Sequence, residues 1–167
     1  MSTIPYDSTK VTLCVFGENI TELGGGAITL TFNSDLISRT AGMQGDHAIT
    51  KNPDRSAILS FSLLQNARQN GVLAGFMAAA DADETWPEFP CTLHDPSSPL
   101  IPVMKDCSLS KPPSISYGSE QADVVWEIFV KDCKLIPQDQ AGSSIVSIAA
   151  TANSMYEGAK KILDLFK

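Results

Sequence analysis

The sequence predicts a mainly β protein of the α+β class, with a β-sandwich or half-barrel, one flanking helix and a C-terminal amphipathic helix. Several short stretches alternate apolar and polar residues, which is typical of strands with one buried face. Glycine- and proline-containing segments separate them. Only two stretches carry apolar residues at steps of three and four. These observations predict a β domain over 1–142 and an appended helical segment over 143–167.

The first two predicted strands are 10–17 and 27–34. The second, AITLTFNS, alternates regularly, so its polar residues share one face and its apolar residues the other. The polar face carries Thr29, Thr31 and Asn33, and the apolar face carries Ile28, Leu30 and Phe32. Residues 19–23 are predicted as a short extension or turn, and the three glycines at 24–26 as a flexible, hairpin-like connection.

The segment 35–55 has scattered apolar residues, two glycines and one proline, with no sustained period. It predicts a long loop, with 38–55 as its functional part. Long loops inside compact domains are uncommon and are often functional.

A strand over 56–65 and a helix over 66–82 follow this loop. In the strand, Leu59, Phe61 and Leu63 form an apolar face, and Ser60 and Ser62 lie on the other. Asn66 is the predicted N-cap. The helix has an apolar stripe made of Val72, Leu73, Phe76, Met77 and Ala80.

Three more strands are predicted, over 89–94, 101–109 and 122–135. The sequence DPSSP predicts a turn between the first two, and Lys111, Pro112 and Pro113 are expected to end the second. Trp126 alternates with other apolar residues of the last strand, so we expect it in the core.

The C-terminal segment has a helical period. Its apolar residues predict an amphipathic helix and include Ile145, Ile148, Met155, Ile162, Leu163 and Phe166. So wide a stripe requires a docking surface on its own sheet, a neighbouring subunit or a membrane. The first two are favoured, because a membrane-surface helix is expected to carry more Lys and Arg.

Composition argues against several functions. The net charge is −7, so phosphate-based binding of nucleic acid is disfavoured. The four cysteines form no CxxC pair, which favours small buried side chains in a reducing compartment. The N-terminus has no apolar signal-peptide run, and no apolar stretch is long enough for a transmembrane helix.

No catalytic motif emerges from the residue spacing. The sequence lacks a phosphate-binding GxxxxGK[ST], a GxSxG elbow and an HExxH pair. Cys91 and His94 are a conceivable nucleophile and base, and the acidic residues at 81, 83 and 84 lack the spacing of a calcium loop. We therefore expect no enzyme activity, no cofactor and no metal.

The stretch 39–76 is the most distinctive. It combines the loop, which ends in Lys-x-x-Asp-Arg-Ser, with a strand ending Leu-Leu-Gln and a helix. With VVWEIFVKDCKL near the end, this order resembles the tail tube proteins of contractile-tailed bacteriophages, in particular the phiTE-like group. The resemblance spans about 8–140.

The resemblance implies a homo-oligomer. Six copies form a ring whose strands close into a β-barrel, and stacked rings form the channel for viral DNA ejection. The protein would be assembled in the host cytoplasm and reside in the virion tail, with sheath, baseplate and tail terminator proteins as partners and no membrane insertion.

The resemblance also implies roles for particular residues. The loop would contact other subunits through Arg39, Thr40, Met43, Asp46, His47, Ile49, Lys51, Asp54 and Arg55. Polar residues would line a non-adhesive lumen at Thr29, Thr31, Asn33, Ser60 and Ser62. Two alternatives stay open: a tube component of a type VI secretion or other contractile injection system, and a small β-barrel enzyme or ligand-binding protein.

Overall fold

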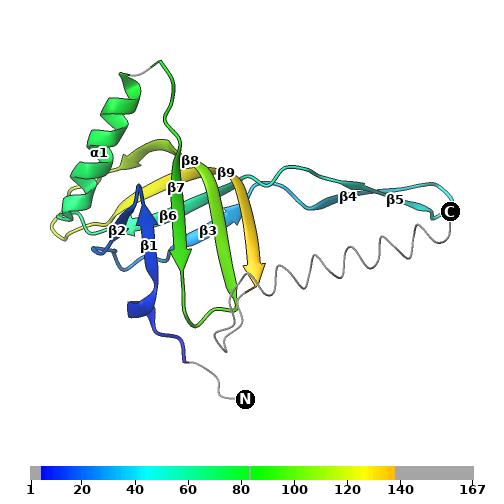
Figure 1. The fold of residues 1–167 in the computed structure, drawn as a ribbon, viewed down its shortest axis with the longest axis horizontal. Coiled ribbons are helices and arrows are strands. Elements are labelled where there is room, and N and C mark those ends of the chain that lie inside the picture. The colour runs from blue at the N-terminus through cyan, green and yellow to red at the C-terminus, as the bar shows by residue number, and fades with distance from the viewer. Residues whose placement is uncertain (1–4, 83, 138–167) are drawn as a thin grey trace.

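The computed structural model describes residues 5–82 and 84–137. Its main feature is a curled seven-stranded sheet with the order β2-β1-β7-β8-β9-β6-β3, in which all neighbouring strands are antiparallel (Figure 1). The strands are β1 (Thr12–Val15), β2 (Glu18–Ile20), β3 (Thr29–Phe32), β6 (Ala57–Leu63), β7 (Phe89–His94), β8 (Leu100–Ser114) and β9 (Val124–Pro137). A mainly β fold is confirmed, as a single curled sheet and not as a sandwich.

Three further elements complete the described chain. They are a 3-10 turn (Ser8–Lys10), the helix α1 (Arg68–Asp81) and a two-stranded ribbon of β4 (Ile37–Ala41) and β5 (His47–Lys51). The predicted C-terminal helix over 143–167 lies outside the described residues, so the division at 142 stays a prediction.

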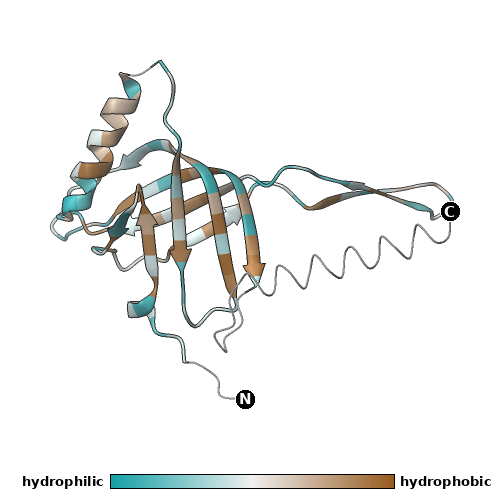
Figure 2. Cartoon of the chain, viewed as in Figure 1, coloured by the Kyte–Doolittle hydropathy of each residue, from teal (hydrophilic) through white to brown (hydrophobic). Residues whose placement is uncertain are grey.

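The concave side of the sheet holds the core. Hydrophobic and hydrophilic residues alternate along its strands, as Figure 2 shows, which is expected of strands with one buried face. Leu59, Phe61 and Leu63 are fully buried, as their alternation predicts. Trp126 is buried opposite Phe61 on β9, and its indole nitrogen donates a hydrogen bond to Asn70 Oδ1 at 2.9 Å. This hydrogen bond satisfies the buried indole N–H and links β9 to Asn70 on α1.

The start of α1 differs from the prediction. Ala67 is the N-cap residue and makes no side-chain capping bond, so the prediction of Asn66 as N-cap was wrong. The cap comes from a distant residue, because the Glu22 carboxylate accepts a hydrogen bond from the Arg68 backbone N–H at 2.8 Å. A carboxylate is favourable at this positive end of the helix.

The glycines at 24–26 do not form a hairpin. They connect β2 and β3, which lie at opposite ends of the strand order. Gly24 N donates to Ser62 O at 2.8 Å. A Cβ at Gly24 would overlap the Asp123 carboxylate, and one at Gly26 would lie 2.6 Å from Ser62 Oγ. Close packing against Asp123 and β6, and not a tight turn, favours glycine at positions 24 and 26.

Strand β8 continues beyond its predicted end. It includes Pro112 and Pro113 and reaches Ser114. The pairing of β8 with β9 shifts register between Leu109 and Lys111 and again between Lys111 and Ser114. Because proline cannot donate to a ladder, it is tolerated at such irregularities.

The prediction of an irregular loop over 38–55 was wrong for the stretches 38–41 and 47–51, which are strands. Residues 37–41 and 47–51 pair as an antiparallel ribbon with no register shift. Figure 1 shows this ribbon projecting from the sheet. We call it the arm, residues 37–51.

Candidate assembly surfaces

The arm is the most exposed structured part of the described chain. All ten residues of β4 and β5 are exposed, and Met43 at its tip is fully exposed. The tip is closed by hydrogen bonds from Gly42 N to Asp46 O at 2.7 Å and from Gly45 N to Gly42 O at 3.1 Å. Gly45 has φ of 90°, a conformation that favours glycine.

The register of the arm separates two chemically different faces. Arg39 lies opposite Ile49, and Ile37 lies opposite Lys51. One face therefore combines apolar and cationic side chains, since residues directly opposite share a face: Ile37, Arg39, Ala41, His47, Ile49 and Lys51. The other carries only small residues: Ser38, Thr40, Ala48 and Thr50. The first face has the composition of a surface that packs on a partner.

The two cations of that face have no ion pair within the described residues. The salt bridges there involve Lys10, Lys111, Lys131 and Lys134, and neither Arg39 nor Lys51. The arm thus presents unpaired positive charge on a chain whose net charge is −7. Such a distribution favours contact with an acidic surface.

The base of the arm is tied to the sheet by Asp54. Its carboxylate accepts hydrogen bonds from Ser34 Oγ at 2.5 Å and from Ser56 N at 3.0 Å. The Ser34 hydroxyl, followed by the Ser56 bonds, lowers the pKa of Asp54 below its ordinary 3.8. Arg55 braces the same turn by donating to Asn52 O at 2.7 Å and to its neighbour's carbonyl at 2.8 Å.

These contacts assign different places to the predicted loop residues. Arg39, Thr40, Ile49 and Lys51 lie on the ribbon, His47 begins β5, and Met43 and Asp46 form the tip. Asp54 and Arg55 hold the base. The prediction brought these residues together as a contact loop, but it missed Ser34, which completes the base.

The lumen candidates lie on the convex side of the sheet. Thr29 and Thr31 pair with Ser60 and Ile58, so they share one face across β3 and β6. Asn33 extends the row by donating to Ser56 Oγ at 3.0 Å. Ser62 is 5% exposed and lies beneath Gly26, so it faces no open surface in this chain.

This convex face is polar but nearly balanced in charge. Glu127, which lies opposite Ser60, pairs with Lys111 at 3.0 Å. Lys131 pairs with Glu88 at 3.5 Å. These pairs leave little net charge on the face, which presents the hydroxyl groups of Thr29, Thr31 and Ser60 beside the apolar side chains of Ile58 and Phe129.

The sheet has two open edges in the part of the chain that the structure describes. There, β2 and β3 end the strand order, and each is paired on one side only. An unpaired edge presents free N–H and C=O groups to any other strand. The edge at β3 adjoins the polar convex face, so pairing there would extend that face into a second chain.

The alternative of a Cys91–His94 catalytic pair has no geometric support. Cys91 pairs with buried Val15, whereas His94 pairs with exposed Thr12, so the two side chains point to opposite sides of β7. Contact with Cys107 and burial raise the pKa of the Cys91 thiol. A protonated, buried thiol is a poor nucleophile.

The other candidate features are a buried cysteine, the acidic cluster and the helix. Burial raises the pKa of Cys133 to about 11. No three His, Cys, Asp or Glu side chains of residues 5–82 and 84–137 are grouped to hold a metal ion; Asp83 of the acidic cluster lies outside them. Within the same ranges, no helix has the length and hydropathy to cross a membrane.

The fold is shared with components of contractile injection systems. One match is a chain of the anti-feeding prophage cap, the tube-terminating cap, with a TM-score of 0.53, 7% identity, and coverage of 81% of this chain and 93% of that one. A second match is a chain of the PVC sheath–tube complex in the extended state. Its TM-score is 0.53 and its identity 9%, and the match covers 80% of this chain and 91% of that one.

A third match is the PVC sheath/tube terminator in the extended state, with a TM-score of 0.50, 9% identity, and coverage of 81% and 98%. No family model and no curated protein matches the sequence. At these identities the likeness concerns the fold, and it agrees with the fold expected from the sequence resemblance.

Proposed function

We propose that this chain is a structural subunit of the tube of a contractile tail or injection apparatus. Copies join side by side into rings, and the rings stack around a channel. The observation that carries the proposal is the arm: a regular two-stranded ribbon whose ten strand residues are all exposed. A two-stranded hairpin is at best marginally stable alone in water, so its regular pairing favours a partner.

The charge of the arm supports a second copy as that partner. One arm face carries Arg39 and Lys51 beside Ile37 and Ile49, with no counter-ion in the described residues. The chain as a whole has seven more acidic than basic residues, so another copy offers acidic surface. Apolar and charged groups together give both affinity and register.

The open edges supply the lateral contact within a ring. In a closed ring, the β3 edge of one subunit pairs with a strand of the next, which satisfies backbone groups that are otherwise free. Heterologous head-to-tail contacts of this kind generate closed rings when the rotation closes. The resemblance to phage tail tubes favours six subunits.

The convex face then lines the channel. Thr29, Thr31, Asn33 and Ser60 would face the lumen, beside ion pairs that leave little net charge. A neutral hydroxyl-rich lining neither binds phosphate strongly nor repels it, so DNA would slide past. Viral DNA ejection from a virion tail is the specific function we favour, with sheath, baseplate and terminator proteins as further partners.

A tube-terminating ring is the second candidate. Two of the similar structures are described as a tube-terminating cap and a sheath/tube terminator, and the matches cover 93% and 98% of those chains. A terminator would use the same lateral contacts, but it would stack on one side only.

Imaging of the purified full-length chain separates these functions. A tube subunit is expected to form rings and stacked tubes at high concentration in negative-stain micrographs, and a terminator to form single rings. A chain that stays monomeric by size-exclusion chromatography at the highest soluble concentration would refute both. Neighbouring capsid and terminase genes would identify a phage tail, as opposed to a secretion system.

A further inference from the structure

The concave side of the sheet is not closed at one end. There, an open groove of about 830 Å³ extends the core surface toward solvent. One wall comes from the segment that includes β3, and the other from the ends of β7, β8 and β9. Apolar residues dominate the lining: Val11, Leu23, Ile28, Leu30, Phe32, Leu93, Leu100 and Leu135.

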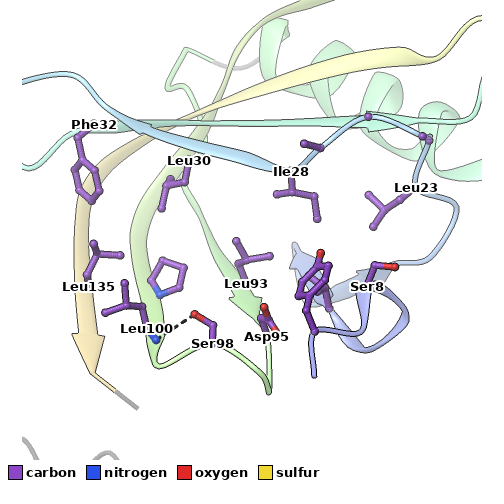
Figure 3. Close-up of a pocket in the computed structure, with 17 residues that line it drawn as sticks. Ser8, Leu23, Ile28, Leu30, Phe32, Leu93, Asp95, Ser98, Leu100 and Leu135 are labelled. Carbon is purple, nitrogen blue, oxygen red and sulfur yellow. Dashed lines mark hydrogen bonds between the residues drawn. The ribbon is translucent and has the colours of Figure 1, made fainter. Parts of the chain in front are cut away.

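Figure 3 shows how the two walls face each other. Leu30 and Phe32 point from β3 across the groove toward Leu100 and Leu135. These last two side chains are 49% and 48% exposed, and Phe32 is 38% exposed. The same apolar face of β3 that packs against the core near Leu59 is thus left uncovered farther along. Contiguous exposed apolar surface of this kind marks a docking site.

The chain itself supplies a matching segment. The described residues end at Pro137, two positions beyond groove-lining Leu135. Residues 138–144 can span at most about 25 Å when extended, so residue 145 can return to the groove. From there to Phe166 the apolar residues recur at helical spacing, and a helix of that length would extend about 33 Å.

We propose that the C-terminal segment 145–166 docks in this groove of its own chain as an amphipathic helix. Its apolar stripe covers Leu30, Phe32, Leu100 and Leu135, and thereby closes the open end of the curled sheet. Attachment at the groove favours the chain's own segment over that of a second copy, because a short tether gives it a high effective concentration.

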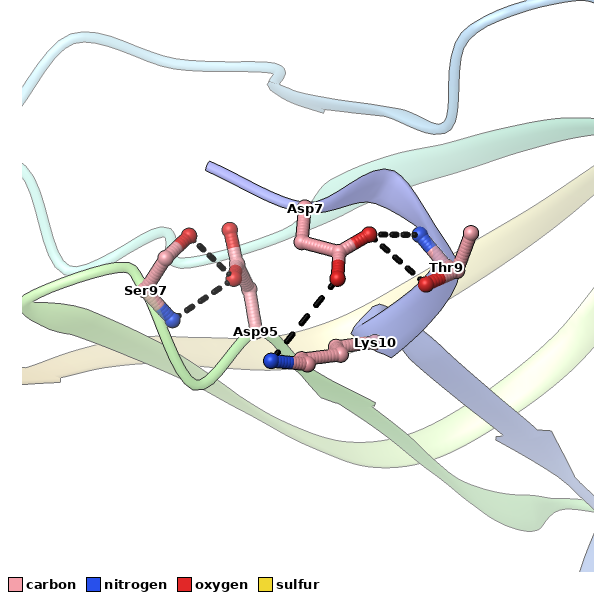
Figure 4. A network of polar contacts seen from close by, with 5 residues as sticks. All are labelled: Asp7, Thr9, Lys10, Asp95 and Ser97. Atoms are coloured by element: carbon pink, nitrogen blue, oxygen red, sulfur yellow. Dashed lines mark hydrogen bonds and ion pairs between the residues drawn. The ribbon is translucent and has the colours of Figure 1, made fainter. Parts of the chain in front are cut away.

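The polar rim of the groove fits the same occupant (Figure 4). Asp95 lines the groove and accepts hydrogen bonds from Ser97 N and Ser97 Oγ at 2.8 and 2.6 Å. The Ser97 bonds lower the pKa of Asp95, so it is ionised at neutral pH. The segment carries Lys160 and Lys161 next to the apolar pair Ile162 and Leu163, which places positive charge beside the stripe.

Paired cysteines in the full-length chain test the docking. In a Cys14→Ser background, Leu30→Cys is combined with Met155→Cys on the stripe or, as the matched control, with Asn153→Cys off it. At dilute protein concentration, mild oxidation is expected to link the stripe pair within one molecule at least tenfold faster than the control pair. Equal rates for the two pairs would overturn the proposal.

Mixing two chains, each with one of the paired cysteines, separates the two sources of the segment. Crosslinked dimers forming as fast as the intramolecular product would show docking on a neighbour and would overturn docking within one chain. These measurements use unassembled protein, so they do not depend on tube formation.

Hydrogen exchange provides a measurement without a cysteine in the groove. In the otherwise unchanged chain, Ile148→Asp with Ile162→Asp is expected to speed exchange of the backbone amides at 28–32 and 100–103 at least tenfold. Asn153→Asp should leave them unchanged. Unchanged exchange in the stripe variant would show that the stripe does not cover these strands, and would refute the proposal.

Discussion

The curled sheet and the arm consist of the same kind of strand but use their side chains differently. In β6, alternate residues such as Leu59 and Phe61 are fully buried against the rest of the chain. In β5, Ile49 is 65% exposed and belongs to a strand with no buried residue. The sheet therefore has a core within its own chain, whereas the arm has strand pairing without a core. We conclude that the stability of the monomer depends on the core of the sheet and not on the arm.

The largest expected effect is on the free energy of unfolding, and it concerns a core residue of the sheet. Leu59→Ala should lower the free energy of unfolding by about 2–5 kcal/mol, because it leaves a cavity in a fully buried position. The matched arm variant, Ile49→Ala, should change it by no more than about 0.5 kcal/mol. Denaturant unfolding of dilute monomer measures both, and similar losses at the two positions would contradict the division.

The next largest effect concerns assembly. Arg39→Glu with Lys51→Glu reverses the unpaired charges of the arm. We expect the protein concentration needed for rings or tubes to rise about tenfold or more, equivalent to about 1.4 kcal/mol per contact. Light scattering and negative-stain microscopy measure this change.

Lys10→Glu is the control for that variant, since Lys10 lies outside the arm and pairs only with Asp7 at 3.7 Å in the described residues. It should assemble as the unchanged chain does, and the monomer stability of both variants should be preserved. Normal assembly of the arm variant would exclude the arm as a contact.

A third experiment uses the convex face of the sheet. Thr31→Arg with Ser60→Arg adds cations to exposed or half-buried positions that pair with neighbouring strands. Tubes should still form, but DNA ejection should slow about tenfold or more, because each new cation can contact a phosphate. The effect should weaken at high salt.

The exchange of Thr31→Ser with Ser60→Thr keeps both hydroxyl groups without adding charge and should eject DNA at the normal rate. If the arginine variant also ejected DNA normally from intact particles, the convex face would not line the channel.

The smallest effect is expected at the junction between arm and sheet. The folded-state pKa of Asp54 is lowered, so its stabilising contribution is complete above the ordinary value of 3.8 and is lost as pH falls through the lower folded value. Amide exchange at residues 52–56 should therefore become faster, relative to the core, below about pH 3.8.

Asp54→Asn should show much of that loosening already at neutral pH, with no further pH step. Asp35→Asn, on the same stretch, is the control. A pH step that persists in the Asp54 variant would assign the titration to another group.

Much of the sheet was predictable because its signals are local. Alternation identified 27–34, 56–65 and 122–135, and the structure contains β3, β6 and β9 there. The strand predicted at 89–94 agrees with β7. The arm was missed, although ISRTA and HAITK flank a glycine-containing turn. Both faces of this ribbon are exposed, so neither needs to be uniformly apolar. Its residues therefore show no apolar period that would predict strands.

The amino-acid sequence by itself determined which faces of β3 and β6 are apolar, that Trp126 is buried, and that a helix follows β6. Those properties depend on side-chain alternation over a few residues. Only the tertiary structure decided that Glu22 caps α1, that Asp54 fixes the arm, and that Leu30 faces Leu135 across an open groove. Each includes a contact between residues far apart in the sequence, such as Ser34 with Asp54 and Leu30 with Leu135, and such contacts carry no local signal.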